Sequence, residues 1–164
     1  LTDVTGVQTC ALPISSFSSN RVEASVSEAW PGVVVRRTLA VHDGDLGDLV
    51  KASSAAEHTY DLFHHVRGTL ETCSVELADA TIPGGGDGYE WLKNIRGGRC
   101  DGRVAFKRRL RDLKKTLEVE CSSTAPFEVF TGTCPDNPAD REMTFLLLRR
   151  KGMTADFTTQ FRVR

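Results

Sequence analysis

Short stretches in which apolar and polar residues alternate recur along the whole sequence, and this pattern is typical of half-buried β-strands. The central stretch, Arg36 to Arg67 with the valines before it, predicts three strands in succession, over Val33–Val41, Leu46–Val50 and His58–Val66. Polar residues connect these strands at His42–Asp45 and Ser53–Glu57, where Gly44 suits a tight turn because it has no side chain to restrict φ.

The strand expected at His58–Val66 is apolar on both of its faces. One face carries Leu62 and the other carries Phe63, because successive side chains of a strand point to opposite sides. A strand of this kind is expected where both faces are covered, as deep inside a β-sandwich.

The remaining sequence predicts further short strands separated by loops. Strands are expected at Arg21–Ala29, Thr69–Leu77 and Pro126–Phe130, followed by a hairpin of Met143–Arg149 and Ala155–Val163 that turns over Lys151–Gly152–Met153. Polar or glycine- and proline-rich loops are expected at Ser15–Asn20, Ile82–Gly88, Arg96–Arg99 and Thr133–Arg141. About eight to ten strands with turns between them predict an all-β fold, an antiparallel two-sheet sandwich.

The segment Val104–Cys121 supports two different structures. Phe106, Leu110, Leu113 and Leu117 lie at helical spacing with charged residues opposite, which predicts a short helix near 104–117. The alternative is a hairpin in which the strands Val104–Leu110 and Thr116–Ser122 flank a polar turn. The all-β setting favours the hairpin, which we take as the prediction.

Length and charge limit the classes of partner. The chain has 164 residues, enough for one domain with a core, and its net charge is −1. A nearly neutral chain gives no basic field that would bind nucleic acid. No apolar run reaches the roughly 18 residues of a membrane-spanning helix. We therefore expect no nucleic acid and no membrane as a partner.

The cysteines and histidines are weak candidates for metal binding. Five cysteines, Cys10, Cys73, Cys100, Cys121 and Cys134, lack the spacing of a zinc ribbon, and buried thiols are expected unless export of the protein allows disulfides. His58, His64, His65 and Asp61 are residue types that bind zinc. Because His64 and His65 point to opposite faces of a strand, at most one of them can join His58, and we expect no metal site.

We expect the N-terminal segment to have a different origin from the rest. Residues 4–14, VTGVQTCALPI, resemble the translation of a common sequencing adapter. We therefore expect residues 1–14 to be an artefact without ordered structure, and residues 15–164 to form a single β-sandwich domain that is truncated on its N-terminal side.

Four sequence patterns carry a resemblance to a known family. WPGVVVRRTL, DGDLGDLV and EHTYDLFHH, followed by FLLLRRKGMTADFTTQF at the end of the chain, resemble the strands of the C-terminal β-domain of heparinase II/III-like polysaccharide lyases. With the weaker middle included, the resemblance extends over residues 22–161. These patterns describe strands and contain no catalytic signature.

The resemblance implies a bacterial, periplasmic or secreted enzyme that cleaves uronic-acid polysaccharides, such as heparan sulfate, heparin or alginate, by β-elimination. In that family the catalytic residues lie mostly in an N-terminal helical toroid, and a divalent metal binds upstream of the region seen here. No residue of this sequence matches those positions. We therefore expect a fragment that is inactive alone, with no catalytic residue and no cofactor, and with an acidic polysaccharide and the missing toroid as its partners.

Six residues remain as candidates for binding an acidic polysaccharide. Arg36, Arg37, His64 and His65 could pair with carboxylate or sulfate groups, and Tyr89 and Trp91 could stack on a sugar ring. A basic cluster of Lys107, Arg108, Arg109, Arg111, Lys114 and Lys115 is expected to be a solvated strand face. The alternative function is a free-standing carbohydrate-binding or structural β-sandwich module.

Overall fold

The computed structural model describes residues 13–164, with only the backbone at residues 28 and 29. Antiparallel strands form almost all of it, together with one turn of 3-10 helix, η1 (Tyr89–Trp91). The strands are β1 (Ile14–Phe17), β2 (Arg21–Trp30), β3 (Val33–His42), β4 (Asp45–Val66), β5 (Gly68–Cys73), β6 (Ala78–Asp79), β7 (Lys93–Cys100), β8 (Arg103–Leu110), β9 (Thr116–Ser122), β10 (Phe127–Pro135) and β11 (Glu142–Val163).

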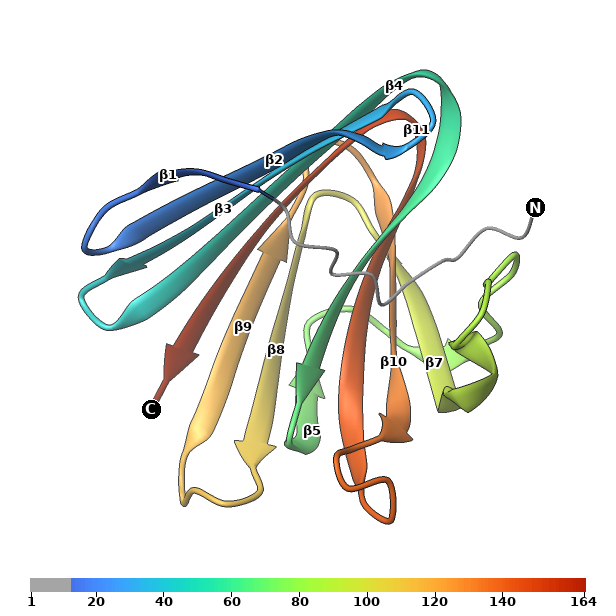
Figure 1. Ribbon diagram of the computed structural model, residues 1–164. Helices are drawn as coiled ribbons and strands as arrows, with labels where there is room; N and C mark the ends of the chain where they lie inside the picture. The colour runs from blue at the N-terminus through green and yellow to red at the C-terminus, as the bar shows by residue number, and fades with distance from the viewer. Residues whose placement is uncertain (1–12) are drawn as a thin grey trace.

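Two long strands, β4 and β11, connect all the others. Each has 22 residues, and they pair antiparallel from Thr144 opposite Val66 to Phe161 opposite Leu46. Their register shifts between Gly152 and Thr154, because the partners of these two residues on β4, His58 and Ser53, are separated by four residues. The two strands bend together there, and β4 takes the longer path around the bend (Figure 1). Such a bulge is a common way to bend a sheet.

The bend folds one hydrogen-bonded sheet into two layers. The first layer contains β1, β2, β3, the first half of β4, the second half of β11, β9, β8 and β5. The second layer contains the second half of β4, the first half of β11, β10, β7 and β6. The expected all-β antiparallel sandwich is therefore confirmed.

The main core lies between the two layers. It includes Phe106, Val119 and Phe157 from the first layer and Val129 and Leu148 from the second. A smaller apolar cluster lies on the outer face of the second layer, where the segment from Ala80 to Leu92 covers Phe130, Phe145 and Leu147. This second cluster explains why His58–Val66 is apolar on both faces, as the sequence predicted.

Two predicted turns are wrong. The strands expected at Leu46–Val50 and His58–Val66 are the two halves of β4, and the expected hairpin of Met143–Arg149 and Ala155–Val163 is the single strand β11. Ser53–Glu57 and Lys151–Met153 form the bend instead of turns, because the two strands pair with each other on both sides of it.

Parts of three predicted loops are strands. Of the loop expected at Thr133–Arg141, residues 133–135 belong to β10, where they pair with β11. Ile14–Phe17 forms β1, so the lead-in Ser15–Asn20 is partly a strand, and Ile14, which was expected to lack ordered structure, belongs to that strand. Residues 1–12 lie outside the described part of the chain, and the adapter origin of residues 4–14 stays a prediction. Arg96–Arg99 is the middle of β7. A Cβ atom at Gly98 would lie only 2.4 Å from the carbonyl oxygen of Glu76, so this glycine serves close packing and not a turn.

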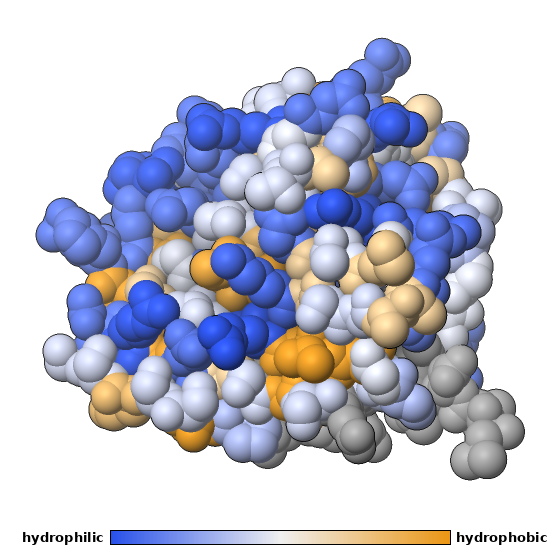
Figure 2. Space-filling view, turned by 90° about the horizontal axis from the view of Figure 1, so that it is seen from above, coloured by the Kyte–Doolittle hydropathy of each residue, from blue (hydrophilic) through white to orange (hydrophobic). Residues whose placement is uncertain are grey.

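The hairpin prediction for Val104–Cys121 is confirmed, since β8 and β9 pair antiparallel and no helix forms there. Leu113, which completed the helical stripe, lies in the connecting turn and is exposed. Within the described residues no helix is long and apolar enough to cross a membrane. Seen from above, the surface is mostly hydrophilic with scattered hydrophobic patches (Figure 2).

Candidate functional site

An ion pair on the outer face of the second layer holds the glycine-rich segment against the sheet. The Arg149 guanidinium of β11 donates to both carboxylate oxygens of Asp61 on β4, over 2.7 and 2.6 Å, and to the carbonyl oxygen of Pro83 over 2.6 Å. The Tyr89 hydroxyl donates to the same carboxylate. The Arg149 side chain is almost fully buried and lies 5.9 Å from the ring centroid of Phe130. Burial and the bond to Asp61 raise the pKa of Tyr89, so its hydroxyl stays protonated.

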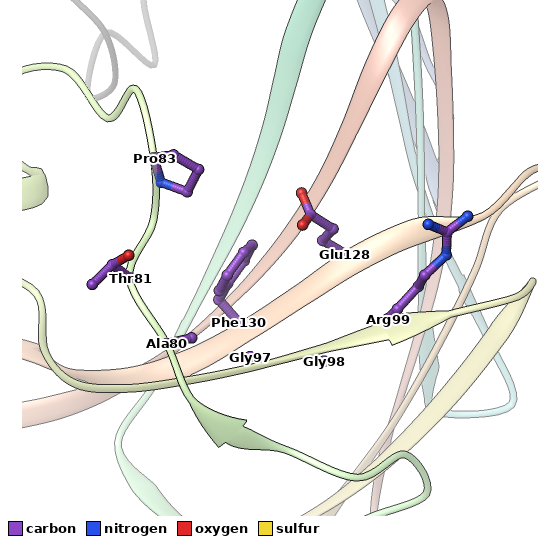
Figure 3. A pocket seen from close by; sticks show the side chains of 8 residues that line it. All are labelled: Ala80, Thr81, Pro83, Gly97, Gly98, Arg99, Glu128 and Phe130. Carbon is purple, nitrogen blue, oxygen red and sulfur yellow. The ribbon is translucent and has the colours of Figure 1, made fainter.

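A shallow pocket of about 370 Å³ lies beside this ion pair. Thr81 and Pro83 form one wall, Glu128 and Arg99 stand on the other side, and Phe130 lies between them (Figure 3). Glu128 of β10 is directly opposite Arg99 of β7 in the strand register. The pocket therefore offers a cationic donor and a carboxylate acceptor side by side, which is a combination that can bind hydroxyl and carboxylate groups.

A second polar cluster lies between the two layers. Arg37 of β3 donates to both oxygens of Asp48 on β4, over 2.9 and 2.7 Å, and Asp48 is buried. His64, from the other half of β4, bonds through Nε2 to the hydroxyl of Thr159 over 3.2 Å. Its Nδ1 lies 4.0 Å from Asp48. The bend in β4 thus brings residues 48 and 64 together inside the sandwich.

Burial controls the protonation of His64. Desolvation lowers the pKa of His64 to about 4, because a charged imidazolium loses its hydration in the core. The nearby Asp48 opposes this shift, but its carboxylate is already paired with Arg37. The imidazole is therefore neutral at pH 7, and its bond to Thr159 stabilises the packing of the two layers.

Arg108 is a fully buried cation without a carboxylate partner. It lies on the inner face of β8 and donates to the hydroxyls of Thr131 and Thr144 and to the carbonyl oxygen of Phe145. Its Nε atom has no hydrogen-bond partner among the described residues. Desolvation lowers the pKa of Arg108 to about 10, which still leaves it charged at pH 7.

The structure separates the six predicted binding residues into distinct places. Arg37 and His64 belong to the buried cluster between the layers. Tyr89 packs edge-on against Phe63, which stacks with His65 on the outer face. Arg36 and Trp91 are exposed, and Arg36 lies 3.7 Å from Glu23. No single surface therefore collects all six.

One residue of the predicted basic cluster has a different environment from the expected one. In the basic cluster, Lys107 and Arg109 pair with Glu118 and Glu71 on a solvated face as predicted, but Arg108 points into the core. The four cysteines of the described residues are free thiols, three of them buried. In this same part of the chain, no group of three or more His, Cys, Asp or Glu residues could hold a metal ion.

The sequence analysis did not identify Asp48, Arg149, Arg99 and Glu128 as site residues. Asp48 and Arg149 become partners of other residues only through the bend and the pairing of β4 with β11. For Asp48 and Arg149, the one signal in the sequence is a charged residue within an alternating strand that is otherwise apolar. Such a residue indicates a charged partner, because an unpaired charge is rarely buried.

Comparisons with known proteins extend this description of the fold. No protein-family model matches the sequence, and no curated protein matches it. Seven solved chains are similar in structure, among them a heparinase III with methylated lysines, at a TM-score of 0.50 and 9% sequence identity. The similarity covers 88% of this chain and 19% of the heparinase III chain. At this identity the comparison shows the fold alone: this chain has the β-sandwich architecture found in one part of a much longer enzyme.

Replacement of Asp61 tests the role of the outer ion pair. The Asp61→Asn substitution leaves the buried Arg149 without a counter-charge, and we expect a loss of about 3 kcal/mol in the free energy of unfolding. Glu57→Gln is the matched control, since Glu57 is also a β4 carboxylate that pairs with a β11 cation, Lys151, but on an exposed surface. It should change stability by less than about 1 kcal/mol. Urea unfolding measures both, and equal losses would contradict this role.

Protonation of His64 should weaken the fold in acid. In the folded protein the pKa of His64 is about 4, which is below its ordinary value of 6.5. The contribution of the neutral imidazole to the free energy of unfolding is therefore complete above pH 6.5, and it is lost as the pH falls towards 4. The loss should be on the order of 3 kcal/mol, and His64→Gln should abolish it. His42→Gln, at an exposed histidine, should keep the wild-type profile of unfolding free energy against pH. The same profile in all three proteins would refute the assignment.

Proposed function

We propose that this chain is the β-sandwich domain of a polysaccharide lyase that cleaves uronic-acid polysaccharides by β-elimination. The observation that carries the proposal is the structural likeness of 88% of this chain to about a fifth of a heparinase III. The sequence patterns of residues 30–39, 43–50, 57–65 and 145–161 resemble the same family. We further propose a heparan sulfate or alginate type of substrate and a periplasmic or secreted location.

The proposed role of this domain is structural and not catalytic. β-Elimination needs a base for the C5 proton, a group that neutralises the carboxylate and an acid for the leaving oxygen. Three residues of suitable chemistry are bound to structural partners: His64 to Thr159, and Tyr89 and Arg149 to Asp61. We therefore assign the reactive groups, and any divalent cation, to the remainder of the enzyme.

The pocket beside Pro83 is a place where this domain could contact the polysaccharide directly. Arg99 could pair with a uronate carboxylate, and Glu128 could accept hydrogen bonds from sugar hydroxyls. This arrangement also supports the second candidate function, a free-standing carbohydrate-binding module. The two functions differ in what lies upstream of Ser15 in the gene, because only a lyase requires a further domain there.

Turnover measurements test the catalytic part of the proposal. The 164-residue chain, mixed with heparan sulfate or alginate, should produce no ultraviolet absorbance of unsaturated uronate, while a heparinase III in parallel degrades heparan sulfate. The same chain extended upstream along its natural reading frame should produce that absorbance with one of the polysaccharides. Turnover by the 164-residue chain alone, or none by the extended protein, would contradict the proposal.

A further inference from the structure

A row of four charged side chains crosses the outer face of the second layer. The strand register sets Asp61 of β4 opposite Arg149 of β11. It also sets Glu128 of β10 between Arg149 and Arg99 of β7. The charges therefore alternate in sign from one strand to the next. At one end of the row Asp61 and Arg149 form a buried ion pair, and at the other end Glu128 and Arg99 line the pocket.

The two charged groups of the pocket keep free hydrogen-bonding atoms. Among the described residues, the ion pair of Arg99 is with Asp101, over 3.8 Å, and both side chains are largely exposed, at 77% and 82%. Such a pair is weak, so a ligand carboxylate can replace Asp101. Glu128 is exposed and forms no ion pair within the described part of the chain, although Arg99 lies directly opposite. A ligand in the pocket therefore meets one guanidinium and one carboxylate side by side.

The floor of the pocket is apolar and lies close to the backbone. Phe130 of β10 is opposite Gly97 of β7. A Cβ atom at Gly97 would lie 2.7 Å from the Phe130 ring and 3.1 Å from the Cβ atom of Ala80, so glycine lets these two groups meet above the strand. Pro83 stands at the opposite wall from Arg99 (Figure 3), and Arg149 holds it there by donating to its carbonyl oxygen. The pocket thus combines charged groups on one side with apolar surface below and opposite.

A uronate has the complementary chemistry. The faces of its sugar ring present C–H groups, and its edge carries one carboxylate beside hydroxyl groups. A guanidinium binds a carboxylate through charge-assisted hydrogen bonds, and a carboxylate accepts hydrogen bonds from hydroxyls. The volume of about 370 Å³ is at the small end of the range of ligand sites, which suits a short stretch of sugar chain.

We propose that this pocket is a binding site for a uronate of an acidic polysaccharide, with the carboxylate at Arg99, the hydroxyls at Glu128 and the ring against Pro83 and Ala80. This inference rests on the proposed function, from which it takes the uronic-acid ligand. It also goes beyond that function, because a lyase whose reactive groups lie elsewhere requires no binding by this domain. The site belongs to the 164-residue chain itself, since all the residues that form it are in this chain.

Titration with oligosaccharides tests the site. The 164-residue chain is titrated with tetrasaccharides from alginate and from heparan sulfate, and with the same compounds after reduction of their carboxylates to alcohols. Amide chemical shifts are recorded by NMR spectroscopy. We expect an acidic tetrasaccharide to bind at least about tenfold more tightly than its reduced form, because only a carboxylate can pair with Arg99. The amides of Thr81 and Gly98 should shift on binding.

Three substitutions at exposed positions identify the groups that bind. Arg99→Gln should weaken binding of the acidic form at least about tenfold, and Glu128→Gln, which keeps one acceptor oxygen, about threefold. Arg103→Gln is the matched control, because Arg103 is a strand arginine that is 71% exposed and lies beside a carboxylate, Glu120, outside the pocket. It should leave the affinity unchanged. The amide spectra of the free variants report whether each one keeps the fold.

Several results would overturn the proposal. They are no binding of either acidic tetrasaccharide, equal binding of the acidic and reduced forms, and equal weakening by Arg99→Gln and Arg103→Gln. Shifts confined to the turn at residues 111–115 would also overturn it, since they would assign binding to the basic cluster.

The lyase assay on the chain extended upstream separates this inference from the proposed function. Binding that Arg99→Gln abolishes, without turnover by the extended protein, would support the site and contradict the lyase. Turnover by the extended protein, without binding by the 164-residue chain, would support the lyase and contradict the site.

Discussion

The pairing of β4 with β11 along their whole length is the interaction on which the rest of the structure depends. The two strands pass together through one bend, so the same hydrogen-bonded pair supplies the centre of both layers. Three strands attach directly to this pair: β3 pairs with β4, and β9 and β10 pair with opposite halves of β11. The remaining strands attach to the pair through these three. Because the bend stacks the two halves of each strand, residues far apart along β4 become neighbours in the core.

The polar clusters follow from that arrangement. Asp48 and His64 lie on the two halves of β4 and meet between the layers, where Arg37 neutralises the carboxylate and the imidazole stays uncharged. On the outer face, register pairing sets Arg149 opposite Asp61, and the glycine-rich segment closes over them. Charged groups in both places are bound to each other, so removal of one partner would leave the other buried without compensation.

Alternation of apolar and polar residues was sufficient to predict the fold class and the two-sided burial of His58–Val66. The β8–β9 hairpin was predicted from the all-β setting, although the spacing of apolar residues in that segment was helical. Alternation could not show that Ser53–Glu57 and Lys151–Met153 bend two continuous strands, because small polar residues and glycine have the same local preferences in a bend as in a turn. The double glycine of β7 looked like a loop for the same reason. Arg108 was assigned to a solvated face because its burial depends on Thr131 and Thr144, which are distant in sequence.

The fold is thus one folded sheet, and its two layers should not unfold separately. Native-state hydrogen exchange in low concentrations of urea tests this claim most directly, with amides on both halves of β4 and β11 as probes. We expect the slowest amides of Asp45–Ser54 and of Thr144–Arg150 to share a single opening free energy, equal to that of global unfolding. Two distinct opening energies, with one half exchanging through its own unfolding while the other stays protected, would contradict the account.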